Sequence, residues 1–251
     1  MNTERLHFDR EAAVYPEGVG TAFVQHLKWQ LIRDRATAGS IAADIGAASG
    51  LHAIPLARLG ATVVAVDLSP EMLARTKRRA ETSGAAGHIH PVVAALPDLP
   101  LAANRFDLVY CYATLLLLPQ PAQEESIRRM AAMLRPGGTL ILDMAGRRSL
   151  AFRYWCRYYR RRGFSGLYGW TLGEVRNLIA ESGLELQDIH PHGVLSQFLL
   201  LPGMQRLPGL ERLLRGHDSR PGLDAWMSRL LPAWAERWYV VARRPRDPAS
   251  G

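Results

Sequence analysis

The hydrophobic pattern over residues 40–145 alternates between short apolar runs and longer stretches with helical spacing. The short, β-branched runs predict strands over 41–45, 61–66, 90–94, 106–112 and 139–144. The longer stretches predict helices over 51–59, 70–82 and 124–134, with Ser69 as the cap of the second helix and Pro70 at its first position. We expect an α/β fold in which right-handed crossovers build a mainly parallel sheet with helices on both faces.

After residue 145 this rhythm is interrupted by an arginine- and aromatic-rich stretch, 147–170. It resumes with a predicted helix over 171–182 and a strand over 184–189, and a last strand is predicted over 237–242. We therefore expect one domain. Its parts are an N-terminal helical segment (1–39) that covers the ligand site, a core (40–146, 171–189 and 234–244), substrate-capping insertions (147–170 and 190–233) and a tail (245–251).

Composition limits the class of protein further. The chain has 251 residues, of which 48% are hydrophobic, so a disordered protein is excluded. Only two cysteines are present, Cys111 and Cys156, which excludes a disulfide scaffold and favours a reducing compartment. The first ten residues are polar, and no apolar run approaches the length of a membrane span. A cytoplasmic location is expected.

The positive charge is concentrated in one segment. The net charge is +8, and seven arginines without any acidic residue lie between Arg147 and Arg162. Nucleic acid is not an expected partner, because the basic residues do not extend over the rest of the fold. On a helix, Phe152, Trp155, Cys156 and Tyr159 would share one face, and Arg153, Arg157, Arg160 and Arg161 an adjoining one.

This arginine-rich segment allows three interpretations. It could be a helix that caps the cleft, with its aromatic face inward and its arginines in water. It could be an interfacial helix that makes peripheral contact with anionic lipid at the inner membrane surface. Its arginines could instead bind an acidic substrate.

The motif that carries chemistry follows the first predicted strand. Residues 43–50 read ADIGAASG, so small residues bring bare backbone to the point where ligands bind in such sheets. Asp67 ends the second strand, and its carboxylate suits the two hydroxyls of a ribose. The dinucleotide fingerprint lacks its third glycine, because Leu51 occupies that position, and a P-loop lysine is absent, so a nucleotide-dependent oxidoreductase is disfavoured. Asp44 is placed to meet a ligand ammonium group.

Four segments together resemble class I S-adenosylmethionine-dependent methyltransferases: DIGAASG, VDLSPEML, LPL with FDLV, and LRPGG. Within that class, the resemblance is to the group that includes the ubiquinone and menaquinone biosynthesis methyltransferases. It implies a Rossmann-like, seven-stranded sheet whose last strand is antiparallel, and it implies S-adenosyl-L-methionine as the cofactor. Gly46, Ala48 and Gly50 would line its methionine part, Asp67 would bind the ribose and Leu68 would flank the adenine.

The resemblance implies further cofactor contacts at Met72, Ala95, Leu96 and Cys111. Related proteins often carry an aspartate where this chain has Ala95. A backbone carbonyl near Ala95 or Leu96 would then accept a hydrogen bond from the adenine, or Asp98 would do so in a shifted register. Tyr15 and Pro16 stand where relatives often place a tyrosine over the cofactor.

Catalytic residues are harder to infer. His190 and His192 follow the sixth strand and Tyr112 ends the fourth, so these three are candidate bases for an acceptor hydroxyl. Histidines and cysteines form no metal-binding pattern. The leucine-rich stretch 194–214 favours a small or lipid-like acceptor, such as a quinone, an isoprenoid or a natural-product phenol. The alternative is a catalytically silent, cofactor-binding adaptor that acts through its arginine-rich aromatic face.

Overall fold

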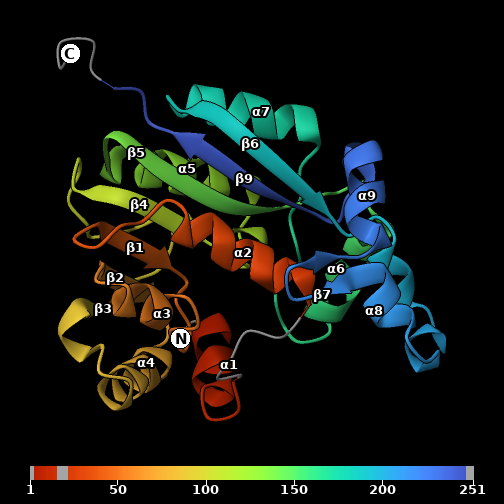
Figure 1. The fold of residues 1–251 in the computed structure, drawn as a ribbon, viewed down its shortest axis with the longest axis horizontal. Helices are drawn as coiled ribbons and strands as arrows, with labels where there is room; N and C mark the ends of the chain where they lie inside the picture. Colours follow the sequence, from red (N-terminus) through yellow and green to blue (C-terminus); the bar gives the residue numbers. More distant parts are fainter. Residues whose placement is uncertain (1–2, 16–21, 247–251) are drawn as a thin grey trace.

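A seven-stranded sheet forms the centre of the protein in the computed structural model, which describes residues 3–15 and 22–246 (Figure 1). The strand order is β3-β2-β1-β4-β5-β9-β6. β9 is antiparallel to both of its neighbours, and the other pairs are parallel. The predicted α/β architecture is confirmed. The strands are β1 (Ile41–Ile45), β2 (Thr62–Asp67), β3 (Ile89–Val93), β4 (Phe106–Cys111), β5 (Leu134–Ala145), β6 (Glu185–His192) and β9 (Arg237–Arg243).

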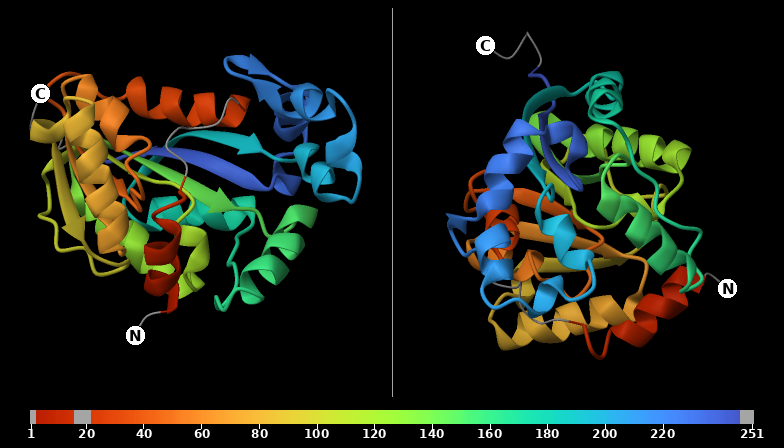
Figure 2. Two further views of the ribbon diagram at one scale, coloured as in Figure 1. Left: turned by 90° about the horizontal axis from the view of Figure 1, so that it is seen from below. Right: turned by 90° about the vertical axis from the view of Figure 1, so that its right-hand side faces the viewer.

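Helices cover both faces of this sheet, as Figure 2 shows from two further directions. On one face lie α2 (Phe23–Arg33), α3 (Ala53–Arg58) and α4 (Pro70–Thr82), which bury Ile32, Leu56 and Leu73 against it. On the other lie α5 (Gln120–Met133) and α7 (Leu172–Glu181), which bury Ile127 and Leu178. Each buried aliphatic side chain contributes roughly 1.5–3 kcal/mol, so these two apolar layers hold the helices in place.

The helix boundaries follow capping chemistry that the sequence carries. Ser69 accepts a hydrogen bond from the backbone N–H of Met72 at 3.1 Å, as predicted for the start of α4. Thr171 and Glu174 form a reciprocal capping box at the start of α7.

Three boundaries differ from the prediction by several residues. β5 begins at Leu134, before the Pro136-Gly137-Gly138 sequence, because a register shift opposite Phe106 and Leu108 accommodates the extra residues. α5 begins four residues before its predicted start, at Gln120, and β6 continues to His192. The other boundaries agree to within about two residues, which is the usual uncertainty of helix and strand ends.

The insertions 147–170 and 190–233, called the cap below, lie at the end of the sheet toward which β5 points (Figure 2). They contain α6 (Leu150–Arg160), α8 (Leu210–Arg215), a two-stranded hairpin, β7 (Gly216–His217) and β8 (Arg220–Pro221), and α9 (Leu223–Leu230). They also contain the 3-10 turns η3 (Ser196–Leu200) and η4 (Met204–Arg206), and the turn η5 (Pro232–Trp234) begins at their end. On α6, Phe152, Trp155, Cys156 and Tyr159 pack against a small apolar cluster, and Arg153, Arg157, Arg160 and Arg161 are exposed.

One buried carboxylate organises the outer part of the cap. Asp224, at 1% exposure, accepts hydrogen bonds from the backbone N–H groups of Gly193, Leu195 and Ser196 at 2.6–2.8 Å. His192 Nδ1 lies 3.1 Å from the same carboxylate. α9 is therefore fastened to the end of β6 by its polar side.

Asp224→Ala is expected to lower the free energy of unfolding by about 3 kcal/mol, because three buried N–H groups would lose a charged acceptor. Equilibrium denaturation measures this change. Glu211→Ala removes a carboxylate that is 61% exposed in the same cap, and it should change stability by no more than about 0.5 kcal/mol. Equal effects of the two variants would contradict this role of Asp224.

Candidate cofactor site

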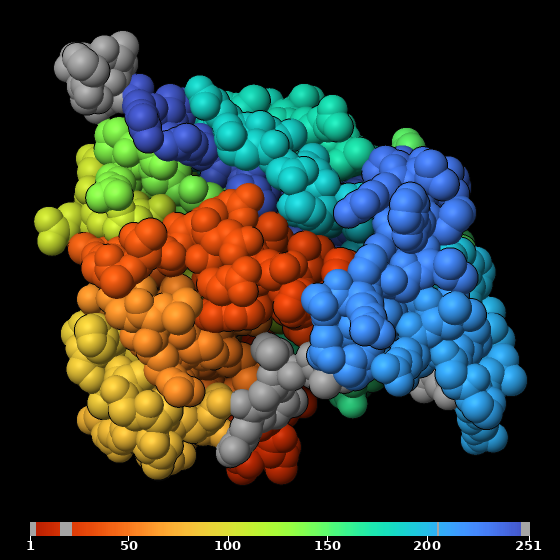
Figure 3. Space-filling model, in the orientation of Figure 1, coloured from red at the N-terminus to blue at the C-terminus, as the bar shows by residue number. Residues whose placement is uncertain are grey.

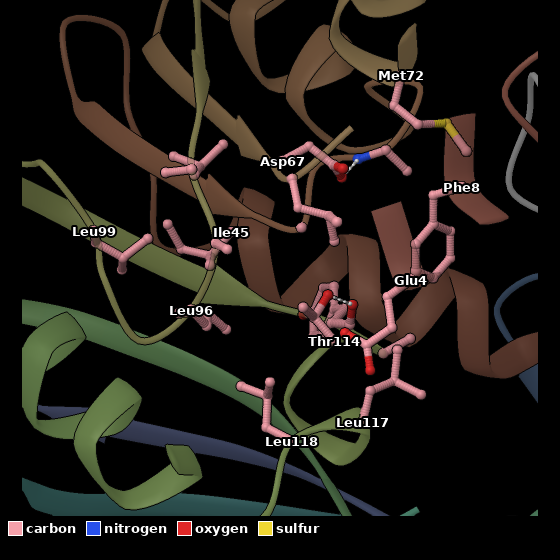
Figure 4. Close-up of a pocket in the computed structure, with 18 of the residues that line it drawn as sticks. Glu4, Phe8, Ile45, Asp67, Met72, Leu96, Leu99, Thr114, Leu117 and Leu118 are labelled. Carbon is pink, nitrogen blue, oxygen red and sulfur yellow. Dashed lines mark hydrogen bonds between the residues drawn. The ribbon is translucent and has the colours of Figure 1, made fainter. Parts of the chain in front are cut away.

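A cavity lies beyond the carboxyl ends of β1, β2 and β4, where ligands bind in sheets of this topology. Counted with its open mouth, it has a volume of about 910 Å³. Figure 4 shows Asp67 on one side of it and Leu117 and Leu118 on the opposite side. The lining residues are Glu4, Phe8, Tyr15, Ile45, Gly46, Ala48, Val66, Asp67, Leu68, Met72, Ala94, Ala95, Leu96, Leu99, Tyr112, Ala113, Thr114, Leu117 and Leu118.

Asp67 joins the two loops that form one end of this cavity. Its Oδ2 accepts a hydrogen bond from the backbone N–H of Ala48 at 2.8 Å, and its Oδ1 accepts one from Ser69 N–H at 2.9 Å. Burial raises the pKa of this carboxyl, and the backbone donors partly offset that rise. The backbone N–H of Leu68 donates to the same carboxylate. A carboxylate has about four acceptor sites, so Asp67 retains one for a donor from a ligand.

The loop after β1 brings bare backbone into the cavity. Gly46 has φ +79°, and a Cβ atom there would come within 2.0 Å of Thr114 Oγ1. Ala48 has φ +46°, a left-handed conformation that a residue with a Cβ adopts at a cost of about 1–2 kcal/mol. The hydrogen bond to Asp67 holds Ala48 in that conformation.

Most of the residues predicted to bind the cofactor lie together in the cavity wall. They are Gly46, Ala48, Asp67, Leu68, Met72, Ala95 and Leu96. Their joint position after β1, at the end of β2, at the start of α4 and after β3 makes this cavity the candidate cofactor site. Asp98, the alternative adenine ligand, is not in the wall.

Three other predicted residues lie outside the wall of this cavity. Cys111 is fully buried in the core, where burial raises its pKa. Gly50 contacts α4, since a Cβ there would lie 2.8 Å from Thr76. Asp44 is paired in register with Tyr110 and accepts a hydrogen bond from the Ala53 backbone, behind the loop.

The N-terminal segment supplies one side of the cavity. Glu4 and Phe8 project from α1 (Thr3–Glu11), and Tyr15 follows it. Burial raises the pKa of Tyr15, and the nearby charge of Asp67 adds to the rise. Pro16 lies outside the described residues. The sequence prediction missed Glu4 and Phe8 because the helix around them has no clear apolar face.

A second group of missed residues comes from the loop after β4. Ala113, Thr114, Leu117 and Leu118 line the cavity. This loop is anchored by Asp143, which accepts the Ala113 N–H at 3.1 Å and receives Arg237 Nη1 at 3.0 and 3.1 Å. The leucine run 115–118 was the available signal, but its apolar character also suited a core segment.

The candidate bases do not converge on the cavity. His190 lies 3.0 Å from Asp188 and His192 pairs with Asp224, and both are on β6, outside the cavity wall. Burial lowers the pKa of both histidines. Tyr112 does line the cavity, but its hydroxyl donates to the carbonyl of Lys28 at 3.1 Å, and burial raises its pKa well above 10.

Membrane-spanning helices and metal-binding clusters are both absent from the described residues. No helix in 3–15 or 22–246 combines the length and apolarity needed to cross a bilayer. Within the same ranges, no three His, Cys, Asp or Glu side chains are grouped so that they could hold a metal ion.

Comparison with known proteins agrees with this geometry. Residues 42–138 match the family described as methyltransferase domain. A ubiquinone biosynthesis O-methyltransferase from Xanthomonas axonopodis pv. citri (strain 306) is 36% identical over 116 residues, which are 46% of this chain and 47% of that relative. The chain therefore spans about half the length of the curated relatives it matches.

Solved structures share the fold over nearly the whole chain. The cyclase SpnF has a TM-score of 0.68 at 16% identity, with 97% of this chain and 96% of that chain covered. Geranyl diphosphate C-methyltransferase from Streptomyces coelicolor A3(2) has a TM-score of 0.66 at 14% identity, with 96% and 98% covered. At these identities the likeness shows the fold alone.

Residues 42–138 therefore match a methyltransferase domain, and the sheet around them has the α/β fold that the solved structures share.

Gly46→Ala is expected to destabilise the protein more than Gly39→Ala does. Both glycines have φ near +80°, but a Cβ at Gly39 has nothing within 4 Å, so this pair isolates the clash with Thr114. The additional loss should be about 1–3 kcal/mol, the usual cost of overpacking. Denaturant titration of both variants measures it, and equal losses would contradict the close approach.

Burial raises the pKa of Asp44 to about 8, so the folded protein binds this proton more tightly than the unfolded chain, where the pKa is near 3.8. The contribution of Asp44 to stability is therefore present at low pH and is lost as pH rises from about 4 to 8. Asp44→Asn should remove that share of the pH dependence. Denaturation curves at several pH values compare the two proteins, and parallel pH profiles would show that Asp44 has an ordinary pKa.

Proposed function

We propose that this protein transfers the methyl group of S-adenosylmethionine to a small or lipid-like acceptor. The observation that supports it most is the cavity where Asp67 and the bare backbone at Gly46 and Ala48 meet a largely apolar wall. Beyond the matched domain, this activity of the whole protein is an inference from its site.

The residues of the cavity fit each part of the cofactor. Asp67 lines the cavity, and its remaining acceptor site suits a ribose hydroxyl. The backbone at Gly46 can approach the methionine part, because there is no side chain between them. Leu68 and Leu96 lie in the wall beside Asp67 and would enclose the adenine, and the backbone at Ala95 would replace the usual aspartate.

For methyl transfer, the protein must then position the two reactants and limit the water around them. When bound, the cofactor supplies a methyl group on a positively charged sulfur, which an oxygen, nitrogen or carbon nucleophile can displace. Phe8 and Tyr15 from the N-terminal segment line the cavity together with Leu117 and Leu118, and these side chains would reduce the water around the bound reactants. Holding the two reactants at about 3–3.5 Å supplies most of the rate, and no covalent enzyme intermediate is needed.

The acceptor class is suggested by the wall and by the names of related proteins. Leu99, Leu117 and Leu118 form an apolar surface away from Asp67. The matched relative is named for ubiquinone biosynthesis and O-methylation, and one neighbour in fold is named for geranyl diphosphate C-methylation. Quinone-like phenols and isoprenoids are therefore the first acceptors to test.

The alternative, a catalytically silent adaptor, is not favoured. Its support in the sequence was Ala95 in place of an aspartate. This replacement removes about one charged hydrogen bond to the adenine. The remaining lining residues retain the polar and backbone groups that the cofactor needs.

Asp67→Asn is expected to weaken S-adenosylhomocysteine binding about 10- to 100-fold, because a ribose hydroxyl would lose a charged acceptor. Isothermal titration calorimetry measures the affinity, and a thermal melt checks that the variant is folded. Asp98→Asn, a matched change outside the cavity wall, should bind like the wild type.

Transfer itself is assayed with methyl-labelled cofactor and a panel of quinone-like phenols and isoprenoids. Unchanged affinity of Asp67→Asn would contradict the cofactor site. Tight, Asp67-dependent binding without transfer to any acceptor in the panel or in extracted metabolites would instead favour the adaptor.

A further inference from the structure

α9 presents its apolar side to solvent. Leu223, Trp226 and Leu230 are spaced three and four residues apart and form one stripe along the helix. Trp226 is 66% exposed and Leu230 is 71% exposed. On the other side of α9, Asp224 and Ser228 are buried and hold the chain after β6.

This orientation is the reverse of an ordinary surface helix, which turns its apolar stripe toward the core. The hydrogen bonds of Asp224 and Ser228 fix this orientation of α9. The apolar surface also continues past the helix to Leu231 and to Trp234, which is 54% exposed. A contiguous exposed patch of this kind indicates an interaction surface.

A second exposed apolar group lies where α6 meets η3. Gln197 Oε1 accepts hydrogen bonds from the backbone N–H groups of Leu150 and Ala151, which ties the start of α6 to η3. Leu150 and Tyr154 on α6 are exposed, and so are Phe198 and Leu201 at η3. Exposed apolar side chains of the cap therefore lie both along α9 and where α6 meets η3.

Positive charge accompanies these residues. Arg153, Arg157, Arg160 and Arg161 are exposed on α6. Of the seven arginines in 147–162, only Arg147 contacts a carboxylate within the described chain, that of Glu174. The exposed acids of the cap, Glu211 and Asp218, are each paired with a basic side chain. The face is thus complementary to an anionic surface.

The views of the molecule place these elements at one end. The right panel of Figure 2 shows this end of the molecule, with α6 toward the right and α8 and α9 toward the left. In Figure 3 the cap residues in blue project beyond the sheet at the same end.

We propose that this end of the cap, termed the docking face, binds the surface of a bilayer that contains anionic lipids. Its members are Leu150, Tyr154, Phe198, Leu201, Leu223, Trp226, Leu230, Leu231 and Trp234, with the arginines of α6. The tryptophans and leucines enter the headgroup boundary, where amphipathic rings are stable. The guanidinium groups bind lipid phosphates.

A bilayer fits this face better than a second copy of the chain does. A symmetric contact would bring the α6 arginines of one copy toward the same face of the other, and the exposed acids available to neutralise them are already paired. This inference does not depend on methyl transfer. If the acceptor is lipid-like, docking would also hold the cavity near the phase that contains the acceptor.

Vesicle flotation tests the proposal with the full chain. The vesicles are phosphatidylcholine alone, or phosphatidylcholine with about a third phosphatidylglycerol. The wild type should float with the anionic vesicles, with a blue shift of tryptophan fluorescence, and much less with the neutral ones. The double variant Trp226→Ser with Leu230→Ser should bind at least about tenfold more weakly.

Two further variants separate apolar from electrostatic contributions. Arg153→Gln, Arg157→Gln and Arg160→Gln together should weaken anionic binding about a hundredfold, roughly fivefold for each arginine. Leu59→Ser changes an exposed leucine just after α3, outside the docking face, and should bind like the wild type. These residues are exposed, so the variants should keep the native fold, which circular dichroism checks.

Several results would overturn the proposal. The first is a wild type that floats with neither kind of vesicle, and the second is a Trp226→Ser, Leu230→Ser variant that floats unchanged. A third is a concentration-dependent dimer in ultracentrifugation that this variant abolishes, without vesicle binding, because the occupant would then be a second copy of the chain. Success or failure here is independent of the calorimetry on Asp67.

Discussion

The carboxylate of Asp67 is the constraint on which the cofactor site depends. It is 8% exposed, and it accepts backbone N–H groups from the loop after β1 and from the loop after β2. These bonds fix the left-handed turn at Ala48 and define the end of the cavity. Asp67 also lines the cavity, so the same group that holds the two loops together can accept a hydrogen bond from a ligand hydroxyl.

The cap is held by a different kind of interaction. Its inner part is apolar, with Phe152, Trp155 and Tyr159 packed against the loop after β4. Its outer part is held by the polar side of α9, where Asp224 binds three backbone N–H groups. Because polar residues face inward there, apolar residues are left outside. The docking face that we propose to bind lipid results from this orientation of α9.

Most of the fold could be predicted from the sequence, because strand and helix periods were clear and the cap at Ser69 was explicit. The side on which a residue lies within a fully buried strand was not predictable. β4 is apolar at nearly every position, so nothing in the pattern shows that Cys111 faces the core. The same ambiguity applied to Asp44, which faces Tyr110 and α3.

The presence of the loop residues in the cavity wall was predictable, since a loop that follows a strand reaches the edge where ligands bind. Residues that come to the site from distant segments were not. Glu4 and Phe8 reach it through the packing of α1, and Leu117 and Leu118 through the Asp143 anchor of the loop after β4. The orientation of α9 was also beyond prediction, because the usual rule that apolar stripes face inward fails there.

The most direct test of the cofactor site is a crystal structure of the protein with S-adenosylhomocysteine. A ribose hydroxyl should lie within hydrogen-bond distance of the Asp67 carboxylate, with the amino-acid part against the backbone of Gly46. A ligand bound elsewhere on the molecule, or a ribose that does not contact Asp67, would contradict the account.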